Sequence, residues 1–241
     1  MPLPRTIWML WLQGWSEAPE IVRACLATWR SRNPGWEVSA LTEGDLDGLI
    51  GGDPLIQAVC GKPIDPQARA NIVRTALLRR YGGVWADATL FCLHPLDCWL
   101  ETPRGFFAFD RPGPDRMLSN WFIAAEPGCY LIEEWAKAVE AYWRPRDQKH
   151  TYFWHHYLFA DRYHSDPRFK ANWDATPKIS ADGPHCFLPY DSRLSAPVTE
   201  AERRLVEQAE QPVLKLTHKV RGEPGSVYDF LCKTGARGET T

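Results

Sequence analysis

Two adjacent glycines, Gly82 and Gly83, separate a helix-forming segment from a short apolar run, and this break strongly constrains the fold. Glycine has no Cβ atom, so a pair of them allows a second backbone or a ligand to approach closely. Val84 and Trp85 suit a buried strand that ends at the carboxylate of Asp87. Open α/β sheets bind ligands at the carboxyl ends of their strands. A core gains nothing from a carboxylate, so we predict a chemical role for Asp87.

The rest of the chain predicts alternating strands and helices. Apolar and aromatic runs predict strands at 6–11, 37–41, 106–109, 121–125 and 213–216, besides the strand at Val84. Helical patterns predict helices at 19–32, 66–80, 131–143, 152–163 and 197–210, and a capping box of Thr42 and Asp45 opens a short one. We therefore expect one α/β domain over residues 1–233, with a mixed sheet flanked by helices, an α-rich C-terminal half and a disordered tail at 234–241.

Composition excludes several classes of protein. A net charge of −2 gives no reason to expect a nucleic-acid partner. Seven scattered cysteines without CxxC spacing argue against a zinc site or a disulfide framework and favour a reducing compartment. No signal peptide and no run of about 20 apolar residues is present, so we expect a cytoplasmic protein. Peripheral contact with the inner membrane and the oligomeric state stay open.

Asn71 and Arg74 are candidates to accompany Asp87 in a site. They are three residues apart, so they share one face of the predicted helix and can converge with Asp87 on a cleft. An arginine there offers a fork of donors to an anion or to hydroxyl groups. The alternatives are that Arg74 is a surface arginine, solvated or paired with a carboxylate, and that Asp87 caps a turn or a helix.

Several segments together resemble a known family. Residues 70–74 with 81–89 resemble the signature of bacterial capsular polysaccharide synthesis glycosyltransferases. These are relatives of the DXD-containing sugar transferases, which include yeast initiating mannosyltransferases and clostridial glucosylating toxins. Residues 11–15, 33–38, 120–125 and 215–219 match the family as well, so the resemblance covers nearly the whole chain.

The resemblance implies a GT-A fold, with a Rossmann-like mixed sheet, and a hexosyltransferase that uses a nucleotide-sugar, with UDP-sugars favoured. The acceptor would be a capsule, lipopolysaccharide or related glycan, including a lipid-linked one. The anomeric configuration would be retained through front-side attack. A bound Mn²⁺ or Mg²⁺ would offset the charge that develops on the leaving diphosphate.

The resemblance also assigns roles to residues. Asp87, Arg74 and Asn71 would be catalytic. Contacts to the donor would also come from Trp11, Gln13, Gly14, Gly82, Gly83, Trp85, Asn120 and Lys219. Asp87 and His218 would bind the metal, and either Lys215 or Lys219 would balance the diphosphate. Thr89 stands where the second aspartate of Asp-x-Asp is expected, and a neutral hydroxyl is a poorer ligand. Either Asp87 takes the metal in place of that second aspartate or metal binding is weak.

The aromatic helix at 152–163 carries His155 and His156. Adjacent residues cannot share a helix face, so they are not a metal-binding pair, and we expect one of them to face the acceptor cleft. Two other functions remain open. A metal-dependent hydrolase of nucleotide-sugar or phosphate substrates would use the same Asp87 and His218. A non-catalytic sugar-binding module is suggested by the twelve tryptophans.

Overall fold

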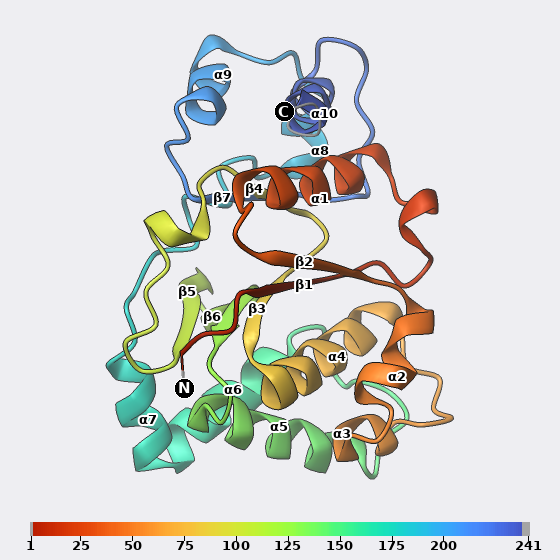
Figure 1. The fold of residues 1–241 in the computed structure, drawn as a ribbon, viewed down its shortest axis with the longest axis vertical. Helices are drawn as coiled ribbons and strands as arrows, with labels where there is room; N and C mark the ends of the chain where they lie inside the picture. The colour runs from red at the N-terminus through yellow and green to blue at the C-terminus, as the bar shows by residue number, and fades with distance from the viewer. Residues whose placement is uncertain (1, 238–241) are drawn as a thin grey trace.

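The computed structural model describes residues 2–237, and its centre is a five-stranded mixed sheet of order β2-β1-β3-β6-β5 (Figure 1). β1 (Thr6–Leu10), β2 (Glu37–Leu41) and β3 (Gly83–Ala86) are parallel. β6 (Arg116–Ala125) and β5 (Phe106–Gly113) complete the sheet with antiparallel pairings. β4 (Leu90–Cys92) and β7 (Val213–Lys215) form a separate two-stranded sheet. The predicted mixed α/β class is confirmed.

Helices cover both faces of the large sheet (Figure 1). One layer contains α2 (Leu46–Ile50), α3 (Pro54–Gln57), α4 (Pro66–Tyr81), α5 (Tyr130–Trp143), α6 (Trp154–Ser165) and α7 (Pro167–Asp174). The other side holds α1 (Glu20–Arg32), the small sheet, α8 (Tyr190–Ser195), α9 (Glu200–Glu207) and α10 (Val227–Arg237). The C-terminal half is rich in helix, as predicted. Over residues 2–237, no helix is both long and apolar enough to cross a membrane.

The central strands are apolar on both faces because both faces are covered. Trp8 and Trp85 pair in register and pack into the core on the α4 side. Ile7 and Val84 pair one residue earlier and pack with Trp29 of α1 on the other side. A strand buried on both faces reads as a continuous apolar run instead of an alternating one. This explains why the short segment after the glycine pair is apolar throughout.

The glycine pair is required by close contacts with the backbones of neighbouring segments. Gly82 has φ +66° and ends α4, and a Cβ there would lie 2.7 Å from the carbonyl oxygen of Ala125. Gly83 has φ +93°, and its Cβ would lie 2.7 Å from the carbonyl oxygen of Thr6. Both residues therefore let the start of β3 fit between β1 and β6, at the opposite end of the strand from Asp87. We withdraw the predicted contacts of Gly82 and Gly83 with the donor.

Gly82→Ala should destabilise the protein without weakening ligand binding. The new Cβ meets backbone at less than 3 Å and imposes a left-handed conformation, so we expect a loss of roughly 1–3 kcal/mol in the free energy of unfolding. Urea denaturation followed by circular dichroism measures it. Gly14→Ala is a matched control, because Gly14 has φ +92° but its Cβ meets nothing within 4 Å. Equal losses of unfolding free energy in the two variants would show that the left-handed backbone conformation, and not packing, requires glycine at position 82.

Other boundaries differ from those predicted. α9 is shorter than the predicted helix at 197–210 because Thr199 and Glu202 form a capping box that starts it at Glu200. α3, α7, α8, α10 and β4 were not predicted. α10 continues to Arg237, so residues 234–237 of the predicted tail are helical, whereas 238–241 lie outside the described residues.

Candidate functional site

A cavity of about 840 Å³ opens at the carboxyl ends of β1 and β3. Its wall combines residues from α4, β6, the start of α6, the segment before α8 and the end of β7. It has the size of a small-molecule site. Of the residues assigned to the site by sequence, the wall contains Trp11, Gln13, Asn71, Arg74, Trp85, Asp87, Thr89, Asn120, His156, Lys215, His218 and Lys219.

Asp87 lies in the middle of the cavity and is held by two donors. Its Oδ1 accepts hydrogen bonds from Arg74 Nη2 at 2.7 Å and from Trp85 Nε1 at 2.9 Å. Arg74 is 3% exposed and also donates through Nη1 to the carbonyl oxygen of Asn120. Burial lowers the pKa of the Arg74 guanidinium, and the charge of Asp87 opposes that shift. Arg74 is thus neither a surface residue nor a free anion fork: it fixes Asp87.

Asn71 and Asn120 extend this arrangement toward α6. Asn120 Nδ2 donates to Asn71 Oδ1 at 3.1 Å and lies 3.2 Å from His155 Nδ1. Asn71 is 1% exposed, and its Nδ2 has no hydrogen-bond partner among the described residues. An amide donor without a partner beside a cavity is suited to a hydroxyl group of a ligand.

Of the two adjacent histidines, His156 lies at the cavity and His155 lies in the core. His155 is fully buried, stacks on Trp135 at 4.0 Å and lies 3.0 Å from Thr75 Oγ1 through Nε2. His156 lines the cavity. Burial, with help from Arg74 and Arg116, lowers the pKa of His156 to about 3. His156 is therefore a neutral hydrogen-bonding group near neutral pH.

The pKa of His156 predicts acid sensitivity of the fold. The unfolded chain binds a proton on this residue below about pH 6.5, whereas the folded chain resists it down to about pH 3. The free energy of unfolding should therefore fall as the pH drops through this window. His156→Gln should show a flatter dependence in urea titrations at pH 4 to 7. Parallel curves for the two proteins would contradict the neutral, buried state of His156.

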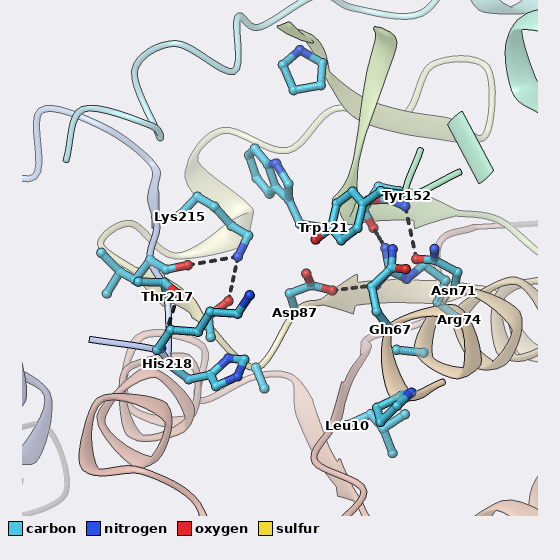
Figure 2. A pocket seen from close by; sticks show the side chains of 18 of the residues that line it. Leu10, Gln67, Asn71, Arg74, Asp87, Trp121, Tyr152, Lys215, Thr217 and His218 are labelled. Atoms are coloured by element: carbon cyan, nitrogen blue, oxygen red, sulfur yellow. Dashed lines mark hydrogen bonds and ion pairs between the residues drawn. The ribbon is translucent and has the colours of Figure 1, made fainter. Parts of the chain in front are cut away.

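The other end of the cavity is basic. Lys215 Nζ donates to Thr89 Oγ1 at 2.6 Å and to the carbonyl oxygen of Leu216 at 3.0 Å. His218 and Lys219 follow, and the His218 ring lies 5.3 Å from that of Trp11. Burial first, then the positive charges of Lys215 and Lys219, lower the pKa of His218. Figure 2 shows Asp87 between Lys215 on one side and Arg74 on the other.

These side chains do not fit the predicted site for Mn²⁺ or Mg²⁺. The Thr89 hydroxyl oxygen accepts a hydrogen bond from the Lys215 ammonium, and Oδ1 of Asp87 already accepts two hydrogen bonds. His218 packs against Trp11 beside two lysines. Between residues 2 and 237, no three His, Cys, Asp or Glu side chains gather in a group that could hold a metal ion. Magnesium and manganese prefer carboxylate and other oxygen ligands, and positive neighbours oppose them. The assignment of Asp87, Thr89 and His218 as metal ligands therefore stays a prediction, and these contacts do not support it.

The sequence patterns did not reveal the whole wall, and Gly14 joins Gly82, Gly83 and His155 among the predicted site residues that do not line it. Gly14 does not line the cavity, although Gln13 beside it does. The wall residues that were not predicted include Asp65, Gln67, Arg116, Trp121, Tyr152, Phe153, His185, Leu188, Tyr190 and Asp191. Residues 185–191 carry no periodic pattern that could have revealed them. Tyr152 and Phe153 begin the predicted aromatic helix, and Trp121 follows Asn120, so these three were within reach of the sequence patterns.

Comparisons with known proteins show which family this chain belongs to. Residues 3–231 match the family described as capsular polysaccharide synthesis protein. The O-glycosyltransferase braB of Annulohypoxylon truncatum is 29% identical over 159 residues, which cover 58% of this chain and 38% of braB. The glycosyltransferase afumC of Aspergillus fumigatus is 30% identical over 158 residues, covering 58% and 40%. The chain thus matches about two fifths of the length of these relatives.

The comparison of folds extends over most of the molecule. The PaToxG glycosyltransferase superposes with a TM-score of 0.55 at 15% sequence identity, covering 88% of this chain and 86% of that one. At this low sequence identity, the superposition shows that the two proteins share a fold and nothing more.

Proposed function

Because the chain belongs to the capsular polysaccharide synthesis family and has a GT-A-type glycosyltransferase fold, we propose that it is a retaining glycosyltransferase. It would move a hexosyl group from a nucleotide-sugar, with UDP-sugars favoured, to a hydroxyl group of a glycan. The acceptor class we propose is a capsule, lipopolysaccharide or related glycan, free or lipid-linked. The reaction would take place in the cytoplasm, and at the inner-membrane surface when the acceptor is lipid-linked.

One observation carries this proposal: the cavity has a hydrogen-bonding end and a basic end with Asp87 between them. Asn71, Asn120 and Arg74 form the first end, and Lys215 and Lys219 border the second. A nucleotide-sugar has the same order of groups, with sugar hydroxyls followed by an anionic diphosphate and a base. The Trp11 ring, at the basic end beside His218, suits stacking on the base.

The chemistry that these residues support is positioning and charge stabilisation. The bond between the sugar C1 and the leaving phosphate oxygen breaks, and its electron pair goes to that oxygen. The acceptor hydroxyl oxygen forms a new bond to C1 on the same face and transfers its proton to the leaving phosphate. Asp87 is fixed through Oδ1, so its other oxygen is available to accept a donor hydroxyl group. No carboxylate base is needed, and the rate enhancement comes from holding the reacting groups in position and stabilising the developing charge.

The mouth of the cavity suits the acceptor. Tyr152 is 59% exposed and Leu188 is 51% exposed, and both border the opening with Phe153. Aromatic faces at an opening pack against the apolar faces of sugar rings. The Phe153 ring is also covered by the Arg116 guanidinium at 4.0 Å, which fixes its position. We propose that the acceptor glycan enters over these side chains.

A thermal-shift panel of UDP-, GDP-, CMP- and dTDP-sugars tests the proposal. A ligand that binds only the folded protein raises its melting temperature. We expect a shift with one nucleotide class, UDP in the first instance, and a smaller shift with Asp87→Ala. A glycan that raises the melting temperature while no nucleotide-sugar does would contradict the transferase and favour a sugar-binding module.

A further inference from the structure

Lys215 is fixed beside Thr89 by the pairing of the small sheet. β4 and β7 are antiparallel, and Lys215 lies opposite Leu90, the residue after Thr89. The backbone N–H of Leu216 donates to the carbonyl oxygen of Thr89 at 2.9 Å. Lys215 Nζ uses two of its three hydrogens on Thr89 Oγ1 and on the Leu216 carbonyl oxygen. One N–H of a well-positioned ammonium group therefore remains for a ligand.

The positive charge of Lys215 is not neutralised by an ion pair: burial lowers the pKa of its ammonium group, and the charge of Asp87 opposes that shift. Both of its acceptors are neutral oxygens. Of the carboxylates that border the cavity, Asp87 pairs with Arg74, Asp65 pairs with Lys149, and exposed Asp191 lies on α8. In the part of the chain that the structure describes, neither Lys215 nor Lys219 forms an ion pair. This end of the cavity therefore carries excess positive charge.

We propose that Lys215, assisted by Lys219, replaces the divalent cation in this chain and binds the diphosphate of the donor, so that donor binding and transfer are independent of metal. The inference rests on the proposed function. In related enzymes a carboxylate at the position of Thr89 would hold a cation. In this chain the Thr89 hydroxyl instead orients the Lys215 ammonium. A dication bound at this hydroxyl would lie within a few ångströms of that ammonium and be repelled by it.

The role of Lys215 in the transfer step is electrostatic. When the C1–O bond breaks, the electron pair moves onto the oxygen of the terminal phosphate, and the negative charge of the nucleoside diphosphate increases. A fixed ammonium group next to that oxygen stabilises the charge as it develops and needs no reorganisation. The proton of the acceptor hydroxyl goes to the leaving phosphate. The step therefore balances with donor and acceptor alone.

Binding of UDP and of GDP, measured by calorimetry in EDTA and again with Mn²⁺, tests this directly. We expect one of them to bind equally well under both conditions. Lys215→Met should weaken binding about tenfold to a hundredfold, the effect of losing a charged hydrogen bond, while Lys215→Arg should retain most of it. Lys137→Met is the matched control, because Lys137 is an exposed lysine on α5 outside the cavity wall.

The outcomes separate this inference from the proposed function. Binding that requires Mn²⁺ would overturn the role of Lys215 and leave a metal-dependent transferase. Binding in EDTA that Lys215→Met does not weaken, with the variant folded by circular dichroism, would overturn it too. No binding of UDP or of GDP, with or without metal, would contradict a transferase that uses UDP- or GDP-sugars.

A double variant tests whether Lys215 stands at the cation position. Thr89→Asp alone should weaken UDP or GDP binding, because the new carboxylate pairs with Lys215 and neutralises it. Thr89→Asp with Lys215→Met provides a second carboxylate near Asp87 and removes the ammonium, so binding should return with Mn²⁺ and be lost in EDTA. If Mn²⁺ does not restore binding to the folded double variant, Lys215 does not stand at a cation position.

Discussion

Asp87→Ala should abolish sugar transfer and destabilise the fold at the same time. The carboxylate is the acceptor for Arg74 and Trp85 and borders the middle of the cavity. Its removal leaves the Arg74 guanidinium, 3% exposed, without a counter-charge. Breaking such a pair costs about 2–4 kcal/mol once the partial exposure of Asp87 is allowed for. Turnover assays and urea denaturation measure the two effects.

A double variant separates activity from stability. Arg74→Met with Asp87→Asn removes both charges, so the cost of an unpaired buried ion disappears. We expect this protein to be more stable than Asp87→Ala and just as inactive. Full activity in Asp87→Ala would contradict the assignment of the site, because the cavity would then work without the group at its centre.

Arg74→Lys should lower turnover about a hundredfold although the positive charge is kept. Arg74 donates through one nitrogen to Asp87 and through another to the carbonyl oxygen of Asn120. A lysine ammonium is a single point and cannot span both acceptors in the same geometry. Asp87 and Asn120 would then lose their common anchor. Steady-state kinetics should show the loss mainly in kcat, because the lysines at the diphosphate end are untouched.

Arg79→Lys is the matched control for this variant. Arg79 lies on the same helix and pairs with Asp53, away from the cavity wall. We expect its turnover to be that of the unmodified protein. A hundredfold loss of turnover in Arg79→Lys as well would mean that α4 does not tolerate lysine in either of these ion pairs. That result would contradict a specific role of Arg74 in the site.

The central part of the fold could be predicted from sequence because its signals are local. The apolar runs of β1, β2 and β3 and the capped start of α4 at Asp65 and Pro66 are properties of a few adjacent residues. The spacing of Asn71 and Arg74 placed both on the side of α4 that meets Asp87. Residues 166–195 have short helices without a clear period, and their positions depend on tertiary packing.

The chemistry of the site was harder to predict because it depends on pairs of residues distant in sequence. Arg74 was expected to offer its donors to an anion or to hydroxyl groups of the ligand, but the fold brings Asp87 against it. Lys215 and Thr89 are 126 positions apart in the chain. They meet because β7 pairs with β4, and no local pattern encodes that register. The glycine pair was interpreted as a ligand contact, whereas backbone atoms of Thr6 and Ala125 require it.

The most direct test of the proposed activity is to follow cleavage of UDP-, GDP-, CMP- and dTDP-sugars by ¹H and ³¹P nuclear magnetic resonance, with and without a capsular glycan. We predict that one donor gives its intact nucleotide leaving group, UDP if the favoured class is right, and a product that keeps the anomeric configuration of the donor. Formation of a nucleoside monophosphate and a sugar 1-phosphate from UDP-, GDP- or dTDP-sugars would contradict this prediction and indicate a hydrolase. No cleavage of any donor with the glycan present would also contradict it.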